Sequence, residues 1–287
     1  MKRIGVVGLG LIGGSFASGL KKRRLVEHIV GYDKDAASLA SALEAGIIDC
    51  AASSVADSAK SVDIMIIAVP VLSVQSILEQ IPLNKIITDV GSVKAPIIEA
   101  SRTVYGKVPE KLIPGHPIAG SEKQGVTSAN PDLFENHMVI LTPLKSTDEN
   151  ATEIIRKLWQ SLGSQVIEMS AARHDNILAQ TSHLPHLLAY ALVEALTSRG
   201  DTMEVLKFAA GGFRDFSRIA ASDPIMWRDI FKANRSEVIK ALDRFLEEIS
   251  SLRQLVSNGD SDAMEKVFKR ARKARNDYLK QFQKYDS

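Results

Sequence analysis

The sequence predicts an α/β domain with a largely parallel sheet, followed by an all-α domain. Short β-branched runs alternate with amphipathic helical stretches through the first half, which is typical of βαβ units. After about Met169 the strand-like runs stop, and helical periodicity continues to the C-terminus. With 287 residues, 45% of them hydrophobic and 24% charged, the chain is long enough for two globular domains. We expect these domains at 1–170 and 171–287.

The composition excludes several classes of protein. The 36 Lys and Arg residues nearly balance the 34 Asp and Glu residues, so a net charge of +2 offers no general attraction to nucleic acid or to an anionic membrane. The single cysteine, Cys50, cannot form an intramolecular disulfide or a cysteine-rich zinc site, which favours a cytoplasmic location. No run of about 18 apolar residues occurs, so we expect no membrane-spanning helix.

Six runs in the first half are expected to be strands. The third of them along the chain, VDIMIIAV, is hydrophobic at nearly every position, which suits a central strand covered on both faces. The run GHPIAGSEKQG (115–125) contains three glycines and a proline, so it can be neither a helix nor a central strand, and we expect a loop there. The expected strands are RIGVVG, HIVGYD, VDIMIIAV, KIITDV, HMVILT and QVIEM.

The first strand runs into a glycine-rich turn, Gly8-Leu9-Gly10-Leu11-Ile12-Gly13. In a strand–turn–helix context, the first glycine permits the tight turn, the second lets a pyrophosphate approach the backbone, and the third lets the helix pack closely. The N-terminal MKRIGVVGLGLIGGSFASGL looks like a signal peptide at first sight, but its spaced glycines and polar continuation favour this motif. The sequence therefore predicts a Rossmann-type dinucleotide-binding domain.

Asp33 ends the next expected strand, 20 residues after Gly13. A carboxylate there accepts hydrogen bonds from the ribose hydroxyls of NAD and repels the 2′-phosphate of NADP. The neighbouring cation Lys34 leaves NADP possible. We also assign Val69, Pro70 and Ser92, which follow later strands, to the cofactor site.

The second half is expected to contain long helices. A helix over 171–198 includes LPHLLAYALVEAL, which is apolar on almost every side, so it should be enclosed by other helices, most simply in a homodimer. Ser222 or Asp223, followed by Pro224, caps a helix that we expect to reach about Val256.

The basic C-terminal stretch MEKVFKRARKARNDYLKQFQK has two interpretations, a nucleic-acid arm or a helix with a charged solvent face. We favour the second, because apolar residues recur at helical spacing and predict one core face. These residues are Met264, Val267, Phe268, Ala271, Tyr278 and Phe282.

The chain contains five motifs in this order: GLGLIGGS (8–15), TDVGSVK (88–94), GHPIAGSE (115–122), TSHLPH (181–186) and GGFRDFSRIAASDPIMWRDIF (211–231). Taken together, they closely resemble the prephenate and arogenate dehydrogenase family of tyrosine biosynthesis. The glycine motif alone is common to many dehydrogenases, whereas the later motifs are much more specific. The resemblance implies a Rossmann domain, an all-helical dimerisation domain, and NAD(P)-dependent oxidative decarboxylation of prephenate to 4-hydroxyphenylpyruvate or of arogenate to tyrosine.

By this resemblance, His116 is the catalytic histidine. As hydride leaves C4 of the substrate, the C4 hydroxyl becomes acidic, and a neutral imidazole within hydrogen-bond reach can take its proton. Ser92 matches a family serine that hydrogen-bonds the same hydroxyl beside the nicotinamide; as an alternative, it caps a helix beginning in GSVKAP.

The substrate carries two carboxylates, and a guanidinium fits carboxylate geometry. By motif position Arg218 is the substrate arginine, while Arg214, one turn away if the stretch is helical, is either solvated or paired with Asp215. We also place Asp215 in the substrate site. His183 and His186, at i and i+3, are either substrate-pocket groups or satisfied core histidines.

That histidine spacing alone does not predict zinc, because no third ligand is evident, and we expect no metal site. The resemblance also implies that Ser121 hydrogen-bonds substrate and that Glu122 is an ion-pairing gate at the pocket mouth. Trp227 either shapes the pocket or belongs to the core.

Several alternatives stay open at this point. Prephenate and arogenate differ only in a keto group or an ammonium on the side chain, so the motifs do not separate them. A hydroxyacid or imine oxidoreductase of the same two-domain plan, or a catalytically silent dinucleotide sensor, would also carry the glycine motif. Since the chain starts at the Rossmann strand and ends at Ser287, we expect a monofunctional protein without a dedicated amino-acid-sensing domain.

Overall fold

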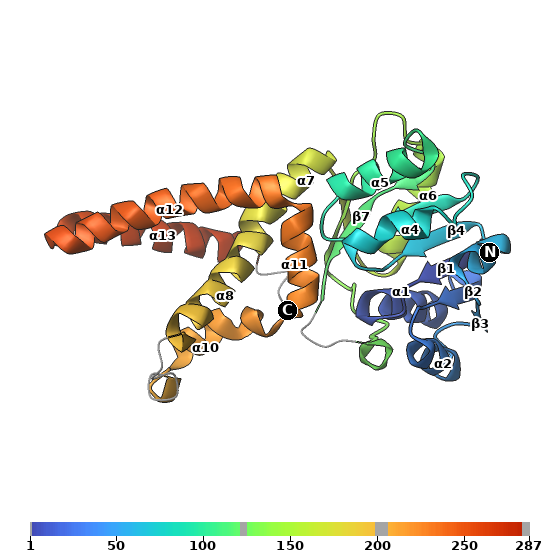
Figure 1. Ribbon diagram of the computed structural model, residues 1–287, viewed down its shortest axis with the longest axis horizontal. Helices are drawn as coiled ribbons and strands as arrows, with labels where there is room; N and C mark the ends of the chain where they lie inside the picture. The colour runs from blue at the N-terminus through green and yellow to red at the C-terminus, as the bar shows by residue number, and fades with distance from the viewer. Residues whose placement is uncertain (1, 121–124, 199–205, 283–287) are drawn as a thin grey trace.

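The computed structural model describes residues 2–120, 125–198 and 206–282. Strands and their covering helices form a compact half that contains the N-terminus, and long helices extend away from it (Figure 1). The last strand ends at Glu168 and the first helix of the extended half begins at Ala171.

The main sheet has six parallel strands in the order β3-β2-β1-β4-β5-β6. This order is the one that defines the doubly wound Rossmann fold, in which a ligand binds where the chain reverses direction across the sheet. That reversal falls between β1 and β4, so the expected fold class is confirmed. The strands are β1 (Lys2–Val7), β2 (Val26–Tyr32), β3 (Cys50–Ala51), β4 (Ile64–Ile67), β5 (Ile86–Asp89) and β6 (Leu112–Ile113).

Two hydrophobic clusters cover the two faces of this sheet. One holds side chains of α1, α2 and α6, with Phe16 and Trp159 in edge-to-face contact at a centroid distance of 4.7 Å. The other holds side chains of α3, α4 and α5, and Trp227 and Ile230 of the helical half join it. The helices are α1 (Leu11–Lys22), α2 (Ala36–Glu44), α3 (Val55–Lys60), α4 (Val74–Leu78), α5 (Ala95–Tyr105) and α6 (Glu149–Ser161).

A second sheet contains β7 (Gly115–Ile118), β8 (Met138–Leu141) and β9 (Gln165–Glu168). Two of the six expected strands, β8 and β9, therefore belong to this smaller sheet. The expectation of a loop was wrong for 115–118, because these residues pair antiparallel with β8. A proline is tolerated there since β7 is an edge strand.

The helical half begins with one nearly continuous helical segment. It consists of α7 (Ala171–Leu178), a π-helical turn η3 (Ala179–His183) and α8 (Leu184–Thr197). The oxygen of Ser170 caps the start of α7 by accepting a hydrogen bond from the backbone N–H of Arg173. The expected helix over 171–198 is present, with a π-turn that sequence periodicity did not indicate.

The expected helix to Val256 is broken at Asn234. Asp223 caps its start as predicted, but α11 (Pro224–Ala233) ends there and α12 (Arg235–Asn258) begins. The Asn234 amide donates to the backbone carbonyl of Asp175 at 2.8 Å and contacts Nδ1 of His183 at 3.1 Å, which holds this residue outside helical geometry. The remaining elements are α10 (Gly211–Ser217), the 3₁₀ turn η4 (Arg218–Ala221) and α13 (Ser261–Phe282).

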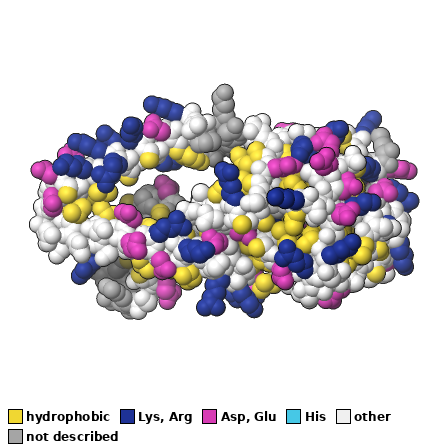
Figure 2. Space-filling view, turned by 90° about the horizontal axis from the view of Figure 1, so that it is seen from above, with side chains coloured by type: hydrophobic (Ala, Val, Ile, Leu, Met, Phe, Trp, Pro, Cys, Tyr) yellow, Lys and Arg dark blue, Asp and Glu magenta, His cyan; other side chains and the backbone are white. Residues whose placement is uncertain are grey.

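Apolar side chains of the helical half are poorly covered within one chain. Only Ala189 of α8 is buried. Figure 2 shows an opening in this half, with hydrophobic side chains (yellow) along its margins. The expected core face of α13 is not a core here, since Phe268 is 56% exposed and Tyr278 46% exposed. The described residues of one chain thus enclose α8 only in part. Within the described ranges, none of the helices is both long and apolar enough to span a membrane.

Candidate active site

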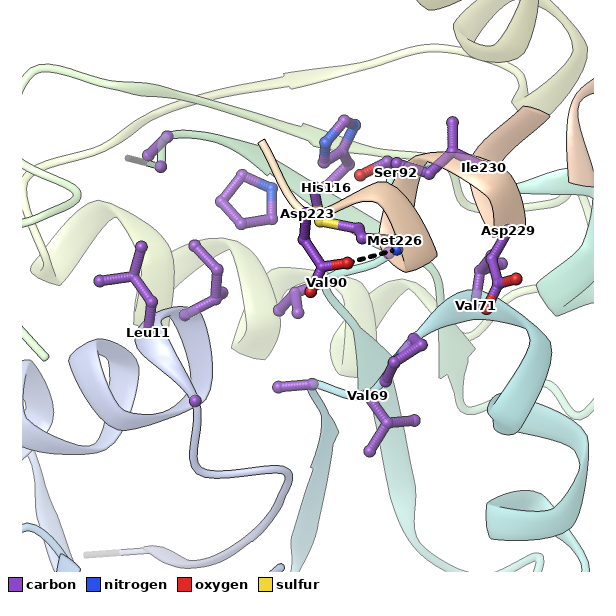
Figure 3. Close-up of a pocket in the computed structure, with 18 of the residues that line it drawn as sticks. Leu11, Val69, Val71, Val90, Ser92, His116, Asp223, Met226, Asp229 and Ile230 are labelled. Atoms are coloured by element: carbon purple, nitrogen blue, oxygen red, sulfur yellow. Dashed lines mark hydrogen bonds between the residues drawn. The ribbon is translucent and has the colours of Figure 1, made fainter. Parts of the chain in front are cut away.

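A cavity of about 440 Å³ lies between the carboxyl ends of the main-sheet strands and α11 (Figure 3). Its size is within the range of small-molecule sites. The glycine turn, the segments after β4 and β5, strand β7 and helix α11 all contribute side chains. Among its lining residues are the predicted Gly10, Leu11, Ile12, Val69, Pro70, Ser92 and His116.

The glycine turn has the geometry that a pyrophosphate requires. Gly8 has a φ of +91°, and a Cβ atom there would lie 2.3 Å from the carbonyl oxygen of Ala68. A Cβ atom on Gly13 would lie 1.9 Å from the carbonyl oxygen of Gly8, whereas a Cβ atom on Gly10 would meet nothing within 4 Å. Among the residues that the structure describes, no side chain caps α1 after Gly10, which leaves the first N–H groups of this helix suited to an anion. These residues fit a dinucleotide.

Asp33 does not line the cavity itself but stands beside the turn, just after β2. One of its carboxylate oxygens accepts a hydrogen bond from the backbone N–H of Leu9 at 2.7 Å, and the other accepts from that of Asp35 at 2.9 Å. The carboxylate therefore also anchors the glycine turn, a role that the motif alone did not indicate.

Ser92 lines the cavity just after β5, and the alternative that it caps a helix is wrong. Helix α5 starts at Ala95, and the side chain at its N-terminus is Asp175 of α7. The two Asp175 oxygens accept from the backbone N–H groups of Lys94 and Ala95, each at 2.8 Å. The Ser92 side chain is therefore not used as a helix cap.

His116 on β7 also lines the cavity, and its Nδ1 atom lies 2.9 Å from Nε2 of His174. Burial lowers the pKa of His116 well below its usual range, and the nearby His174, Lys94 and His183 lower it further. The ring is therefore neutral at physiological pH, the form that a proton acceptor needs.

A buried ion pair lies behind His116. The fully buried ammonium of Lys94 contacts the carboxylate of Asp89 and donates to the carbonyl oxygen of Gly115, while that carboxylate also accepts from the backbone N–H of Gly115 at 3.2 Å. Burial lowers the pKa of Lys94, and Asp89 opposes this effect. The pair ties β5 to β7 next to the histidine. Both residues lie in TDVGSVK, but their spacing alone gave no sign of burial.

A second group of predicted residues surrounds Trp227. His186 stacks on its ring at a centroid distance of 3.7 Å, and His183 meets it edge-on at 6.0 Å. Burial lowers the pKa of His183 to about 4, and its buried Nε2 atom has no hydrogen-bond partner within the described part of the chain. Burial and the charge of Arg218 lower the pKa of His186, although a hydrogen bond to the carbonyl of Ser182 opposes them. The two histidines thus face one side, as their spacing predicted.

The remaining predicted substrate residues are less closely gathered. Arg218 starts the turn η4 and is exposed, and Asp215 on α10 is exposed and does not line the cavity. Arg214 lies in α10 and Arg218 in the 3₁₀ turn that directly follows it, so the stretch is helical but not one continuous α-helix. Ser121 and Glu122 lie outside the described residues. No cluster of three His, Cys, Asp or Glu side chains that could hold a metal is found in 2–120, 125–198 and 206–282.

Sequence reasoning missed several residues of this site. Asp223, which caps α11, lines the cavity together with Met226, Asp229 and Ile230 of that helix, and His174 contacts His116. The first four lie in the quoted SDPIMWRDIF, whereas nothing in the periodicity around His174 indicated a link to residue 116.

Two family models match consecutive parts of the chain. The first, described as prephenate dehydrogenase, nucleotide-binding domain, matches residues 16–168. The second, described as prephenate dehydrogenase, dimerization domain, matches residues 170–270.

Curated relatives agree with these models over nearly the full chain. A prephenate dehydrogenase of Bacillus subtilis is 37% identical over 94% of this chain and 74% of its own length. A cyclohexadienyl dehydrogenase of Zymomonas mobilis is 34% identical over 96% of this chain and 95% of its own.

Solved structures show the same arrangement of elements. A prephenate dehydrogenase from Aquifex aeolicus, in complex with hydroxyphenyl propionate and NAD+, superposes with a TM-score of 0.90 at 35% identity, covering 96% of this chain and 98% of the other. A Synechocystis arogenate dehydrogenase gives a TM-score of 0.80 at 28% identity, covering 96% and 99%. The chain therefore belongs to the prephenate dehydrogenase family.

Proposed function

We propose that this oxidoreductase catalyses the NAD-dependent oxidative decarboxylation of prephenate, arogenate or both, with His116 accepting the C4 hydroxyl proton. One observation carries the proposal: the neutral imidazole of His116 lines the same cavity as the glycine turn at Gly10. A bound nicotinamide supplies the hydride acceptor at this site. The family membership and the NAD+ bound to the Aquifex aeolicus relative support the choice of cofactor.

The residues of this chain would divide the work as follows. The imidazole takes the hydroxyl proton as the C4 hydrogen departs as hydride, the ring carboxylate leaves as CO2, and the ring becomes aromatic. The Ser92 hydroxyl, which is also in the cavity, hydrogen-bonds the same hydroxyl and orients it toward His116. Both residues belong to the nucleotide-binding half, so their positions relative to each other do not depend on a movement of the helical half.

The substrate carboxylates would be bound from the helical half. Nδ1 of His183 accepts from the Asn234 amide, so the hydrogen of the neutral ring is on Nε2. This Nε2 is a buried donor without a hydrogen-bond partner among the described residues. Such a donor is costly unless a ligand or water satisfies it. Together with His186 and the guanidinium of Arg218, it supports an anion site next to the cavity. Asp215, Ser121 and Glu122 remain predicted members of the substrate site as a whole.

The cofactor preference follows from Asp33. Its carboxylate, fixed by two backbone N–H groups, would accept the ribose hydroxyls of NAD and repel a 2′-phosphate. Lys34 next to it leaves some use of NADP. We further propose that the chain acts as a homodimer through its helical domain, and a cytoplasmic location stays a prediction.

The test is the absorbance of NADH after purified protein is mixed with NAD and either prephenate or arogenate. We expect turnover with at least one substrate, and comparing kcat/KM for the two settles the preference. A hydroxyacid or imine oxidoreductase would stay silent with both, and so would a dinucleotide sensor that binds NAD without turnover. Silence with both substrates would refute the proposal, provided that NAD binding confirms a folded site.

A further inference from the structure

We propose that His174 and Asp175 are positioning residues that fix the tautomer of His116, so that Nδ1 of His116 carries the hydrogen and Nε2 offers a lone pair to the substrate. This inference rests on the proposed function, since it concerns the same histidine. It assigns part of the proton-accepting apparatus to the helical domain.

The three side chains form one hydrogen-bonded row. Nδ1 of His116 lies 2.9 Å from Nε2 of His174, and Nδ1 of His174 lies 2.7 Å from a carboxylate oxygen of Asp175. The His174 ring is completely buried and Asp175 is 3% exposed. Neither lines the cavity, so both act on the substrate only through His116.

The direction of the hydrogen bonds follows from the end of the row. The two Asp175 carboxylate oxygens accept backbone N–H groups, from Lys94 and Ala95, so both oxygens act as acceptors. Nδ1 of His174 must then donate to it. In its neutral form this ring has a single N–H, so its Nε2 atom can only accept.

Nδ1 of His116 must therefore be the donor in the next hydrogen bond. A neutral imidazole with its hydrogen on Nδ1 has an unprotonated Nε2, which is the atom left to face the cavity. A free imidazole has no such constraint and populates both tautomers, one of which would point an N–H at the substrate hydroxyl. The row thus selects the tautomer that can accept a proton.

The same row stabilises the charged product of proton transfer. When Nε2 of His116 takes a proton, Nδ1 keeps its hydrogen and its bond to His174. The carboxylate of Asp175 at the far end offsets the new positive charge. The ammonium of Lys94 would oppose it, but that charge is paired with Asp89.

The row also joins the two domains. His116 is on β7 of the nucleotide-binding half, whereas His174 and Asp175 are in α7, the first helix of the helical half. Helix α7 also contacts α5 of the nucleotide-binding half. The histidine is therefore held in the required form only when the domains are docked.

The direct test is the tautomer of His116, read from the side-chain nitrogen shifts of the ¹⁵N-labelled wild-type protein. The signals of His116 are assigned by their loss in His116→Asn. We expect the hydrogen on Nδ1 in both His116 and His174. A hydrogen on Nε2 of His116 would overturn the proposal, including the case in which His174 is an imidazolium.

Variants of His174 test the same point through catalysis. His174→Phe keeps a ring of similar size but removes both hydrogen bonds, so kcat should fall by about 10-fold to 100-fold, less than for loss of the base itself, with KM little changed. His174→Gln can bridge the same two partners through its amide oxygen and nitrogen, and it should recover part of the loss. His137→Phe, at a histidine that does not line the cavity, is the matched control.

The outcomes separate this inference from the proposed function. A wild-type protein with Nδ1–H on His116 but no turnover with either substrate would support the row and refute the activity. An active enzyme with Nε2–H on His116 would refute the role of His174 and Asp175 but not the proposed activity. The same holds for an active enzyme whose tautomer and kcat do not change in His174→Phe. The wild-type measurement stands even where a variant does not fold.

Discussion

At the scale of single residues, the environment of His116 sets the pH range in which it can accept a proton. A free histidine has a pKa of about 6.5, and burial together with nearby His174 and Lys94 lowers that of His116. This environment disfavours the imidazolium form of His116, so the ring stays neutral at pH values at which a free histidine would already be protonated.

This shift predicts the shape of the pH profile. A plot of log kcat/KM should stay flat as the pH falls through about 6.5 and should decline only at more acidic pH, where His116 becomes protonated. The measurement is initial NADH formation from pH 5 to 9, about the range over which histidines titrate. A midpoint of about 6.5 or higher would mean that the buried ring is not the group that titrates.

Removing the base should have a large effect on turnover. We expect His116→Asn to lower kcat by about 100-fold to 10,000-fold, because the amide cannot take the proton. NAD affinity, measured by fluorescence titration, should change little, since the glycine turn is untouched. Activity near the wild-type level would refute a catalytic role for His116.

The carboxylate of Asp33 should control cofactor choice. Asp33→Asn keeps a group that can accept the Leu9 N–H but removes the charge that repels a 2′-phosphate. The ratio of kcat/KM for NADP over NAD should rise by about tenfold or more, which corresponds to about 1.4 kcal/mol. Asp35→Asn, which changes only the cap of α2, is the control. An unchanged ratio would assign discrimination to other residues.

At the scale of elements, the strands and the glycine turn were predictable because their signals are local. Each of the six expected strands exists, since a β-branched run between turn residues needs no distant partner to be recognised. The loop expected at 115–118 is instead β7, because pairing with β8 overrides the breaker signal of Gly115 and Pro117 at an edge.

The break at Asn234 was not predictable from periodicity. The residues on both sides continue a helical pattern, and the interruption comes from hydrogen bonds to residues 175 and 183, which are distant in sequence. The same is true of the buried Lys94, whose partners are Asp89 and the carbonyl of Gly115. Long-range polar contacts of this kind leave no periodic signal.

Asn234 should therefore stabilise the helical half more than an ordinary residue between two helices, because its amide has two buried hydrogen-bond partners. Asn234→Ala leaves a buried carbonyl and a buried ring nitrogen without their donor, and we expect the free energy of unfolding to fall by about 1 to 3 kcal/mol. Urea denaturation measures the change. Asn258→Ala, at the exposed end of α12, should differ from wild type by about 0.5 kcal/mol or less. Equal effects of the two substitutions would contradict a special role for Asn234.

At the scale of the whole molecule, the helical half exposes more apolar surface than an isolated chain is expected to tolerate. On α12, Leu246 is 52% exposed, Ile249 44% and Val256 65%. The apolar sequence of α8 predicted a partner, but which faces remain open could only be seen once the helices were placed.

These faces predict how the dimer can be broken. The double variant Leu246→Glu, Ile249→Glu should halve the molar mass measured by light scattering, because charges would be buried in the interface. Glu248→Ala, on another side of α12, should leave the mass unchanged. A wild-type protein that is already monomeric would refute the predicted dimer, and a double variant of unchanged mass would place the interface elsewhere.

The capping of α5 by Asp175 has a consequence for how the two domains can be exchanged. A helix of the nucleotide-binding domain receives its N-terminal hydrogen-bond acceptor from the other domain. A chimera of two related proteins joined near residue 170 would therefore take α5 from one parent and the residue at position 175 that caps it from the other. Such a chimera would lose the hydrogen bonds that cap α5, unless the second parent also has an aspartate at position 175.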